Sequence, residues 1–210
     1  MSGPAADRPA AETPLAPVEH GEGGVAVPLP SPYSRREKIA RLAWTVVQAT
    51  LFRWSFHTWY RWRRRLLLVF GATLQPTVRI RRTARIECPW NLEIGSETST
   101  GDRATLYCLG KVRIGSGVTI SQGAHLCAGS HNYNSRALEL LRLPIVIGDD
   151  AWIAAEAFVG PGVEVGEGAI LAARGVALRN LDPWTIYVGN PAEPVKARER
   201  PDGVERSRAS

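Results

Sequence analysis

The sequence has no long hydrophobic run. Among its 210 residues, the longest uninterrupted apolar stretch is Leu66–Ala72, which has seven residues. A helix that crosses a bilayer needs roughly twenty, so the sequence predicts no transmembrane segment. The N-terminus also lacks the basic and then apolar pattern of a secretory signal peptide. We therefore expect a cytoplasmic protein.

Cysteine is scarce as well. The three cysteines, Cys88, Cys108 and Cys127, are odd in number, and no two of them form a CxxC motif. This excludes a disulfide framework and a cysteine-rich zinc site, and it fits a reducing compartment. Glycine and proline are abundant at 20 and 15 residues, whereas methionine occurs once. That composition favours many tight turns over a helical bundle.

The net charge of +6 is concentrated in one part of the chain. Residues 33–90 carry a net +11, whereas residues 1–32 and 91–197 each carry −3 and residues 198–210 carry +1. Because the basic residues are confined to one segment of a mildly acidic protein, the charge pattern does not indicate nucleic-acid binding.

Composition divides the N-terminal third into two regions. Residues 1–32 hold seven of the fifteen prolines and almost no large apolar residues, so we expect a disordered tail. Residues 33–73 read as a basic, aromatic helical segment. Ser34 followed by Glu37 forms a capping box, and apolar residues follow at helical spacing. They are Ile39, Leu42, Ala43, Val46 and Val47. At the other end, residues 198–210 read as a polar tail.

The helical segment is rich in aromatic residues. Seven lie between Trp44 and Trp62, interleaved with arginines. These arginines are Arg53, Arg61, Arg63, Arg64 and Arg65. Such a stretch can lie on an anionic membrane surface, which predicts peripheral association with the inner membrane. In the alternative, the aromatic rings pack on the body of the protein and the arginines face water.

A six-residue repeat predicts the fold of residues 74–197. Aliphatic residues recur at Ile147, Ile153, Val159, Val165 and Leu171. A small residue follows four positions after each of them. Five such hexads in a row would occur by chance about once in a hundred thousand trials, so the pattern is a repeat. Six residues suit one short strand and one tight turn. Three units then close a triangular coil, and stacked coils pair their strands in parallel.

The repeat extends upstream but is interrupted. The phase slips by two residues between Leu106 and Ile114. After Leu126 the chain leaves the repeat and resumes its phase near Ile145, which predicts a loop of about sixteen residues. Insertions in a solenoid lie on one face and often carry the binding site.

Several segments resemble one protein family. Ile147–Ile153 and Asn180–Ala192 are similar to the hexapeptide-repeat acyltransferases. Within them, Ser55–Phe70, Pro89–Leu92 and Ile120–His131 resemble the colanic acid biosynthesis acetyltransferase group. The resemblance implies an all-β protein, a left-handed parallel β-helix with an N-terminal helical segment, assembled as a homotrimer. It also implies acetyl-CoA as co-substrate, no metal, and O-acetylation of a sugar hydroxyl in exopolysaccharide biosynthesis. The acceptor would be a sugar or a lipid-linked saccharide.

The same resemblance assigns the catalytic base. An alcohol is a poor nucleophile near neutral pH, and an imidazole titrates where a base is useful. His131 lies in the interrupting loop and matches the family's catalytic histidine, so we expect direct transfer with His131 as general base. The resemblance does not carry over the acceptor contacts. We expect them at Ser130 and Asn132, which flank His131, and at Trp152, which follows the loop and can stack on a sugar ring. In the alternative, Trp152 is only an exposed aromatic at a corner of the coil.

The resemblance also predicts where acetyl-CoA binds. In the family the CoA arm runs along the later coils against small residues. The expected contacts are Ala155, Ala173, Leu178, Arg179, Asn190 and Lys196. Arg179 and Lys196 are the expected partners of the CoA phosphates.

Two alternatives remain open at this point. A hexapeptide carbonic anhydrase would need three histidines around a metal. His125 and His131 are six residues apart, but the repeat holds no third histidine. A non-catalytic β-helix scaffold is the other alternative, and turnover of acetyl-CoA with candidate acceptors would distinguish it from an enzyme.

Overall fold

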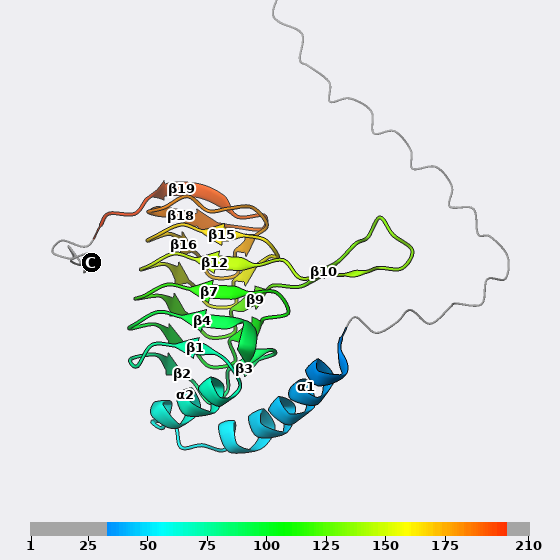
Figure 1. The fold of residues 1–210 in the computed structure, drawn as a ribbon. Helices are drawn as coiled ribbons and strands as arrows, with labels where there is room; N and C mark the ends of the chain where they lie inside the picture. Colours follow the sequence, from blue (N-terminus) through cyan, green and yellow to red (C-terminus); the bar gives the residue numbers. More distant parts are fainter. Residues whose placement is uncertain (1–32, 201–210) are drawn as a thin grey trace, which may run out of the picture. The chain divides into compact units, whose positions relative to one another are not determined.

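The structure is a computed structural model that describes residues 33–200 (Figure 1). The expected disordered tail, residues 1–32, and residues 201–210 of the expected polar tail lie outside the described part of the chain. A helical segment comes first, and a stack of short strands follows it.

The N-terminal segment contains three helices. Helix α1, Arg35–Val47, starts at the predicted cap, where the Ser34 hydroxyl accepts a hydrogen bond from the Glu37 N–H at 3.1 Å. It continues into a π-helix, η1, Gln48–Phe52. A loop then leads to α2, Tyr60–Val69, which contacts β1 and β2 of the first coil. No helix among residues 33–200 is both long and apolar enough to cross a membrane.

The apolar residues that predicted α1 do not face the core. Ile39, Leu42 and Val46 are exposed. The buried contact is made by Trp44, whose indole Nε1 donates a hydrogen bond to the Ile86 carbonyl oxygen at 2.6 Å. The first coil has no coil below it to satisfy its backbone groups, so α1 turns its hydrogen-bonding side chains toward that coil instead.

Three parallel sheets run along the body of the molecule, one on each side of a triangular coil. The first contains β1 Thr73–Leu74, β4 Leu92–Ile94, β7 Val112–Ile114, β12 Ile145–Ile147 and β15 Glu164–Val165. The second contains β2 Arg79–Ile80, β5 Ser99–Thr100, β8 Thr119–Ile120, β13 Trp152–Ile153, β16 Ile170–Leu171 and β18 Thr185–Val188. The third contains β3 Arg85–Ile86, β6 Thr105–Tyr107, β9 His125–Cys127, β14 Phe158–Val159 and β17 Val176–Ala177.

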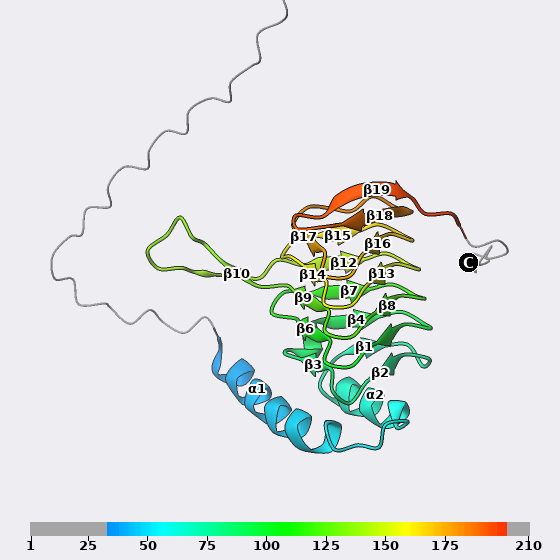
Figure 2. The same ribbon diagram turned by 180° about the vertical axis from the view of Figure 1, so that it is seen from behind.

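The chain therefore makes five coils, and a strand pair closes the last one. β18 pairs in parallel with β16, and β19, Glu193–Ala197, returns antiparallel to β18. The stack lies between this pair and the N-terminal helices (Figures 1 and 2). Both ends of the solenoid thus have a cover, the helices at one end and the β18–β19 pair at the other, although β19 itself is an exposed edge strand.

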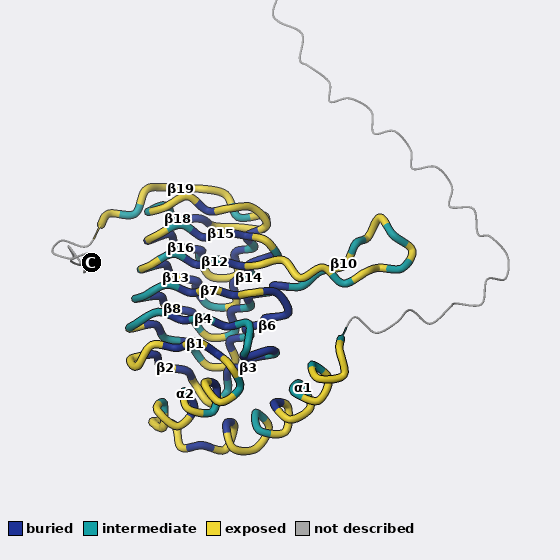
Figure 3. The backbone as a smooth tube through the Cα atoms, viewed as in Figure 1, coloured by how far each residue is buried: buried dark blue, intermediate teal, exposed yellow. Residues whose placement is uncertain are grey.

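The predicted register of the repeat is confirmed. The five aliphatic residues of the repeat, Ile147, Ile153, Val159, Val165 and Leu171, all have an exposed fraction of 2% or less. The small residues four positions later are buried too. Buried stretches recur in successive coils (Figure 3). The turns use positive φ angles where glycine was expected, at Gly117, Gly162 and Gly168.

Length variation is confined to one corner of the coil, where the third sheet passes to the first. Ile86 and Ile94 are eight residues apart, as are Leu106 and Ile114, because two extra residues are accommodated here in each of the first two coils. The first of these turns contains the short 3-10 helix η2, Pro89–Asn91. The long interruption after Leu126 begins at the same corner, so the three departures from the repeat lie one above another.

Candidate active site

The interruption forms a hairpin arm, residues 128–144, that projects sideways from the solenoid (Figures 1 and 2). Strand β10, Ser130–His131, pairs antiparallel with β11, Leu140–Leu141. The sequence predicted only a loop here. The pairing places Ser130 opposite Leu141 and His131 opposite Leu140, so the catalytic candidate lies on a strand.

Glycine allows the base of the arm to lie close to the coil. A Cβ on Gly110 would lie 2.7 Å from the Leu143 carbonyl oxygen and 2.9 Å from that of Ala128. Both distances are shorter than a carbon and an oxygen tolerate. The absence of a side chain at Gly110 therefore lets both ends of the arm cross over the turn below them.

The imidazole of His131 is held by a backbone carbonyl. Its Nδ1 lies 2.6 Å from the carbonyl oxygen of Leu138, across the tip of the arm. A carbonyl oxygen only accepts hydrogen bonds, so Nδ1 carries the proton and donates it. In the neutral ring, the lone pair is then on Nε2. Since the side chain is exposed, Nε2 is available to accept a proton from a bound hydroxyl.

Polar contacts within the tip of the arm maintain its shape. Asn132 donates its backbone N–H to the Glu139 carbonyl, and its side-chain oxygen accepts from the Asn134 N–H. The Ser135 hydroxyl donates to the Glu139 carboxylate at 2.8 Å, which lowers the pKa of that carboxyl. Together these contacts fix the turn that brings Leu138 to His131.

The base of the arm is tied to helix α1. Arg142 forms an ion pair with Glu37, with 3.0 Å between Nη2 and Oε1. The Tyr33 ring lies between two guanidinium groups, 4.3 Å from that of Arg41 and 5.2 Å from that of Arg142. Arg41 in turn pairs with Glu87 on the first coil at 2.6 Å. Through this network, the N-terminal segment supports the arm that holds His131.

Two of the predicted CoA contacts lie one above the other. Ala155 follows β13 and Ala173 follows β16, and both are in turns between the second and third sheets. The Arg174 N–H donates to the Ala155 carbonyl at 2.9 Å, so the two turns are stacked in successive coils. Ala173 is exposed and Ala155 half-buried. Their small side chains leave the backbone of this corner accessible to an extended ligand.

The other predicted CoA contacts are spread over the C-terminal coils. Leu178 and Arg179 follow β17 and are exposed at the corner from which the arm projects two coils earlier. Asn190 lies in the turn between β18 and β19, before a cis bond to Pro191, and Lys196 is an exposed residue of β19. One protomer therefore does not gather the six predicted residues and His131 into a single pocket.

The predicted acceptor residue Trp152 lies apart from the arm. It is on β13 of the second sheet, is 43% exposed, and donates its indole N–H to the Ser121 hydroxyl at 2.9 Å. Ser130 and Asn132 flank His131 on the arm itself. Within one protomer, these two are the predicted acceptor residues that accompany His131.

The second histidine of the repeat has a different environment. His125 lies on the third sheet between the rings of Tyr107 and Phe158, and burial lowers its pKa. No group of three or more His, Cys, Asp or Glu residues that could hold a metal ion occurs among residues 33–200. Histidine 125 is thus part of an aromatic stack, separate from the arm.

The buried cysteines are poor nucleophiles. Burial raises the pKa of the Cys88 thiol to about 11, and it raises the pKa of Cys108, which is fully enclosed, well above its ordinary value. A thiol attacks as its thiolate. Neither side chain is therefore suited to form an acyl-enzyme near neutral pH.

Sequence reasoning missed the groups that position His131. The Leu138 carbonyl that fixes the imidazole is a backbone atom, which leaves no signal in side-chain chemistry. Glu37 and Arg142 are 105 residues apart. Glu37 was recognised only as part of the capping box, and Arg142 lies in no recognisable motif. Their pairing depends on how the solenoid end and the arm meet, and a single sequence carries no signal of that contact.

Solved structures of known proteins share this fold. A galactoside acetyltransferase solved with coenzyme A matches with a TM-score of 0.73 and 20% identity, over 80% of this chain and 86% of that one. A hexapeptide-repeat acetyltransferase of Vibrio cholerae O1 biovar eltor, solved with acetyl coenzyme A, matches with a TM-score of 0.71 and 22% identity, over 80% and 91%. The fold is thus the left-handed parallel β-helix of the hexapeptide-repeat acetyltransferases, as the sequence predicted.

Sequence comparison narrows the class to a family. A protein of Escherichia coli K12 that is named as a colanic acid biosynthesis acetyltransferase, WcaF, is 41% identical over 155 residues, which cover 74% of this chain and 85% of the relative. No family model matches the sequence. The chain belongs to the colanic acid biosynthesis acetyltransferase family and is an acetyltransferase.

Proposed function

We propose that the protein transfers the acetyl group of acetyl-CoA to a sugar hydroxyl in exopolysaccharide biosynthesis, with His131 as general base. The observation that carries this proposal is the 2.6 Å contact between Nδ1 of His131 and the Leu138 carbonyl oxygen, which leaves Nε2 as the acceptor. The name of the E. coli relative supports a saccharide acceptor, which could be lipid-linked. The two solved neighbours, with coenzyme A and acetyl coenzyme A, support the co-substrate.

The reaction needs no covalent intermediate on the protein. Nε2 of His131 takes the hydroxyl proton as the sugar oxygen attacks the thioester carbonyl carbon. The tetrahedral oxyanion then collapses, the carbon–sulfur bond breaks, and the CoA thiolate takes the proton back from the imidazolium. The contact with Leu138 stabilises the imidazolium, because its Nδ1–H keeps its acceptor throughout.

The arrangement of the predicted residues favours an oligomer. His131 stands on an arm that projects from its own coil, while Ala155 and Ala173 line the far edge of the third sheet. A site that joins the arm to this edge would be completed by a second copy that supplies the other half. We therefore propose a homotrimer with its sites between subunits, located in the cytoplasm where acetyl-CoA would be supplied. A monomer in sedimentation at micromolar concentration would contradict this part.

The test is steady-state kinetics with acetyl-CoA and candidate saccharides. His131→Ala should lower kcat about 10²–10⁴-fold, while acetyl-CoA binding, measured by calorimetry, stays near wild type. His57→Gln is the matched control, because His57 is an exposed histidine at the N-terminal end of the molecule. Full activity of His131→Ala, or an acetylated Ser or Cys trapped by mass spectrometry, would refute the general-base mechanism. No turnover of acetyl-CoA with any saccharide would favour the scaffold alternative.

A further inference from the structure

Several large apolar side chains at the N-terminal end of the described molecule are exposed to solvent. Five residues of η1, the following loop and α2 form what we call the aromatic end face. They are Leu51, Trp54, Phe56, Trp59 and Trp62, and Trp54 is 81% exposed. Trp44 and Phe52, from the same segment, are buried. The sequence left open whether these rings pack or face outward, and the structure shows that they divide between the two.

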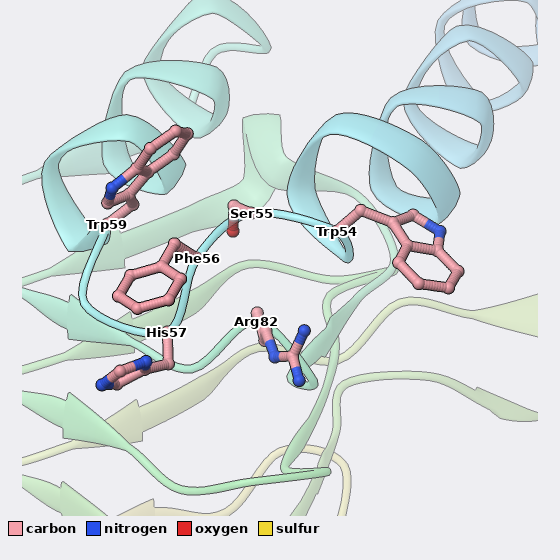
Figure 4. A pocket seen from close by; sticks show the side chains of 6 residues that line it. All are labelled: Trp54, Ser55, Phe56, His57, Trp59 and Arg82. Carbon is pink, nitrogen blue, oxygen red and sulfur yellow. The ribbon is translucent and has the colours of Figure 1, made fainter.

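The rings of the aromatic end face are spread apart and enclose shallow hollows. One hollow of about 480 Å³ is lined by Trp54, Ser55, Phe56, His57, Trp59 and Arg82. Figure 4 shows the Trp54 ring directed away from Phe56 and Trp59, with the Arg82 side chain between His57 and Trp54 in this view. A second hollow of about 380 Å³ shares Trp54 and Trp59 and also reaches Leu51 and Trp62. The face thus offers several separate apolar groups over a broad area.

The segment that forms this face carries charges of one sign, and the carboxylates nearby, Glu97 and Asp102, are paired with Arg79 and Arg81. No aspartate or glutamate occurs between Glu37 and Glu87, a stretch that holds eleven lysines and arginines. Four exposed arginines of this region have no carboxylate partner within residues 33–200. They are Arg53, Arg61, Arg65 and Arg82. A surface of this kind attracts an anionic partner.

The loop that presents the rings is held rigidly. Arg63 is fully buried, and its guanidinium donates hydrogen bonds to the Ser55 hydroxyl at 2.9 Å, the Phe56 carbonyl at 2.9 Å and the His57 carbonyl at 2.8 Å. Its Nε donates to the Ile80 carbonyl on the first coil at 2.6 Å. Trp54 and Phe56 are therefore exposed on a fixed support, so their ordering requires no partner.

We propose that the aromatic end face docks the protein on an anionic lipid bilayer. Tryptophan favours the headgroup region, where its apolar ring can be buried while its indole N–H stays hydrated, and phenylalanine adds apolar area at the same depth. The four unpaired arginines fit a negatively charged surface, which attracts basic groups over a broad and flat area. Aromatic rings that are spread apart can each insert into the deformable interface of a bilayer. A second copy of this chain is a poorer partner, because its own face would carry the same positive charge.

Vesicle flotation with the full chain tests the proposal. The probes are vesicles of phosphatidylcholine alone and of phosphatidylcholine with 30% phosphatidylglycerol. Wild type should bind the anionic vesicles at low salt, should bind the neutral ones far more weakly, and should dissociate as salt rises. Each arginine near the surface contributes about a fivefold gain in partitioning. Replacing Arg53, Arg61, Arg65 and Arg82 by glutamine should thus weaken binding about 600-fold.

A second variant tests the rings. Trp54→Ser with Trp59→Ser should weaken binding about 10-fold and should reduce the quenching of tryptophan fluorescence by brominated acyl chains. The control replaces Lys111, Arg113, Arg136 and Arg200 by glutamine, which removes the same charge from exposed positions far from the face. It should bind like wild type. Circular dichroism melting confirms that every variant remains folded.

Three results would overturn the proposal. They are no binding of wild type to anionic vesicles at low salt, equal loss of binding in the control and the face variant, and binding to poly-glutamate in the absence of vesicle binding. The last would make the face a docking site for an acidic protein. None of these outcomes bears on acetyl transfer, because the four arginines and two tryptophans lie outside the proposed catalytic site.

Discussion

Replacing Arg63 should destabilise the fold more than replacing any other arginine of its helix. Its side chain is fully buried without a carboxylate partner, and it donates to four oxygens. Two of these acceptors, the Ile80 carbonyl and the Ser55 hydroxyl, are themselves buried. In Arg63→Met they lose their donor while water cannot reach them.

The magnitude follows from these two acceptors. A buried polar group left without a partner costs about 1–3 kcal/mol, and the loss of a charge-assisted network adds to this. Relief of the desolvation of the guanidinium offsets part of the cost. We expect Arg63→Met to lower the free energy of unfolding by about 3–5 kcal/mol. At about 2–4 °C per kcal/mol for a domain of this size, the melting temperature should fall by about 10 °C.

The assay is thermal unfolding followed by circular dichroism, with Arg65→Met as the matched control. Arg65 lies two residues later on α2 and is exposed, and Arg65→Met removes the same charge as Arg63→Met. This control should lower the free energy of unfolding by no more than about 0.5 kcal/mol. Equal melting temperatures for the two variants would refute the reasoning.

The destabilisation should not depend on pH near neutrality. Desolvation lowers the pKa of Arg63 in the folded protein. The group is nevertheless protonated in both the folded and the unfolded states below both pKa values. Its contribution to stability is therefore constant from about pH 5 to 9 and changes only in strong alkali.

Three further variants test the coil and the arm. Val159→Asp buries an unpaired charge at an inward position and should cost about 3–5 kcal/mol in chemical denaturation; wild-type stability would contradict the register. Thr100 is an inward residue whose hydroxyl has no partner, so Thr100→Val should raise the free energy of unfolding by about 1 kcal/mol, and a loss of stability would show that the hydroxyl is satisfied. Arg142→Gln removes the ion pair with Glu37 and should speed hydrogen exchange in residues 132–139 several-fold, whereas unchanged exchange would show that the tip is held by its own contacts alone.

The coil could be predicted because its constraints are local and repeated. Ile153 and Val159 each sit at the start of a hexad, and every hexad must place one aliphatic and one small side chain in the same narrow interior. A single sequence then contains many copies of one rule. The position of His131 in the interruption could be predicted for the converse reason, since a break is visible only against a regular background.

The packing of the N-terminal segment was harder to predict from the sequence, because it follows no repeat. Its apolar spacing correctly indicated a helix, yet Ile39 and Leu42 face solvent while Trp44 is buried. Arg63 lies in a basic run with Arg61, Arg64 and Arg65, and the sequence does not distinguish it from them. It is buried because its position on α2 faces the open carbonyls of the first coil. A contact of this kind depends on how the helix packs against the coil, and the sequence of neither segment alone predicts that packing.

The corner where the arm leaves the coil shows how the repeat accommodates an inserted segment that carries His131. Each strand must pair with the coils above and below, so an insertion survives only if its two ends return to the same place. The pairing of β10 with β11 brings the ends together, and β12 then pairs with β7 in register, with Ile145 opposite Val112 and Ile147 opposite Ile114. The insertion of the arm therefore breaks no hydrogen bonds between the neighbouring strands.

A histidine within an unbroken hexad would point either into the aliphatic interior of the coil or outward from a sheet among its neighbours, as His125 does beside Phe158. His131 is set away from the coil on a two-stranded support, and its Nε2 is exposed to a substrate because the repeat is broken there and nowhere else between β7 and β17.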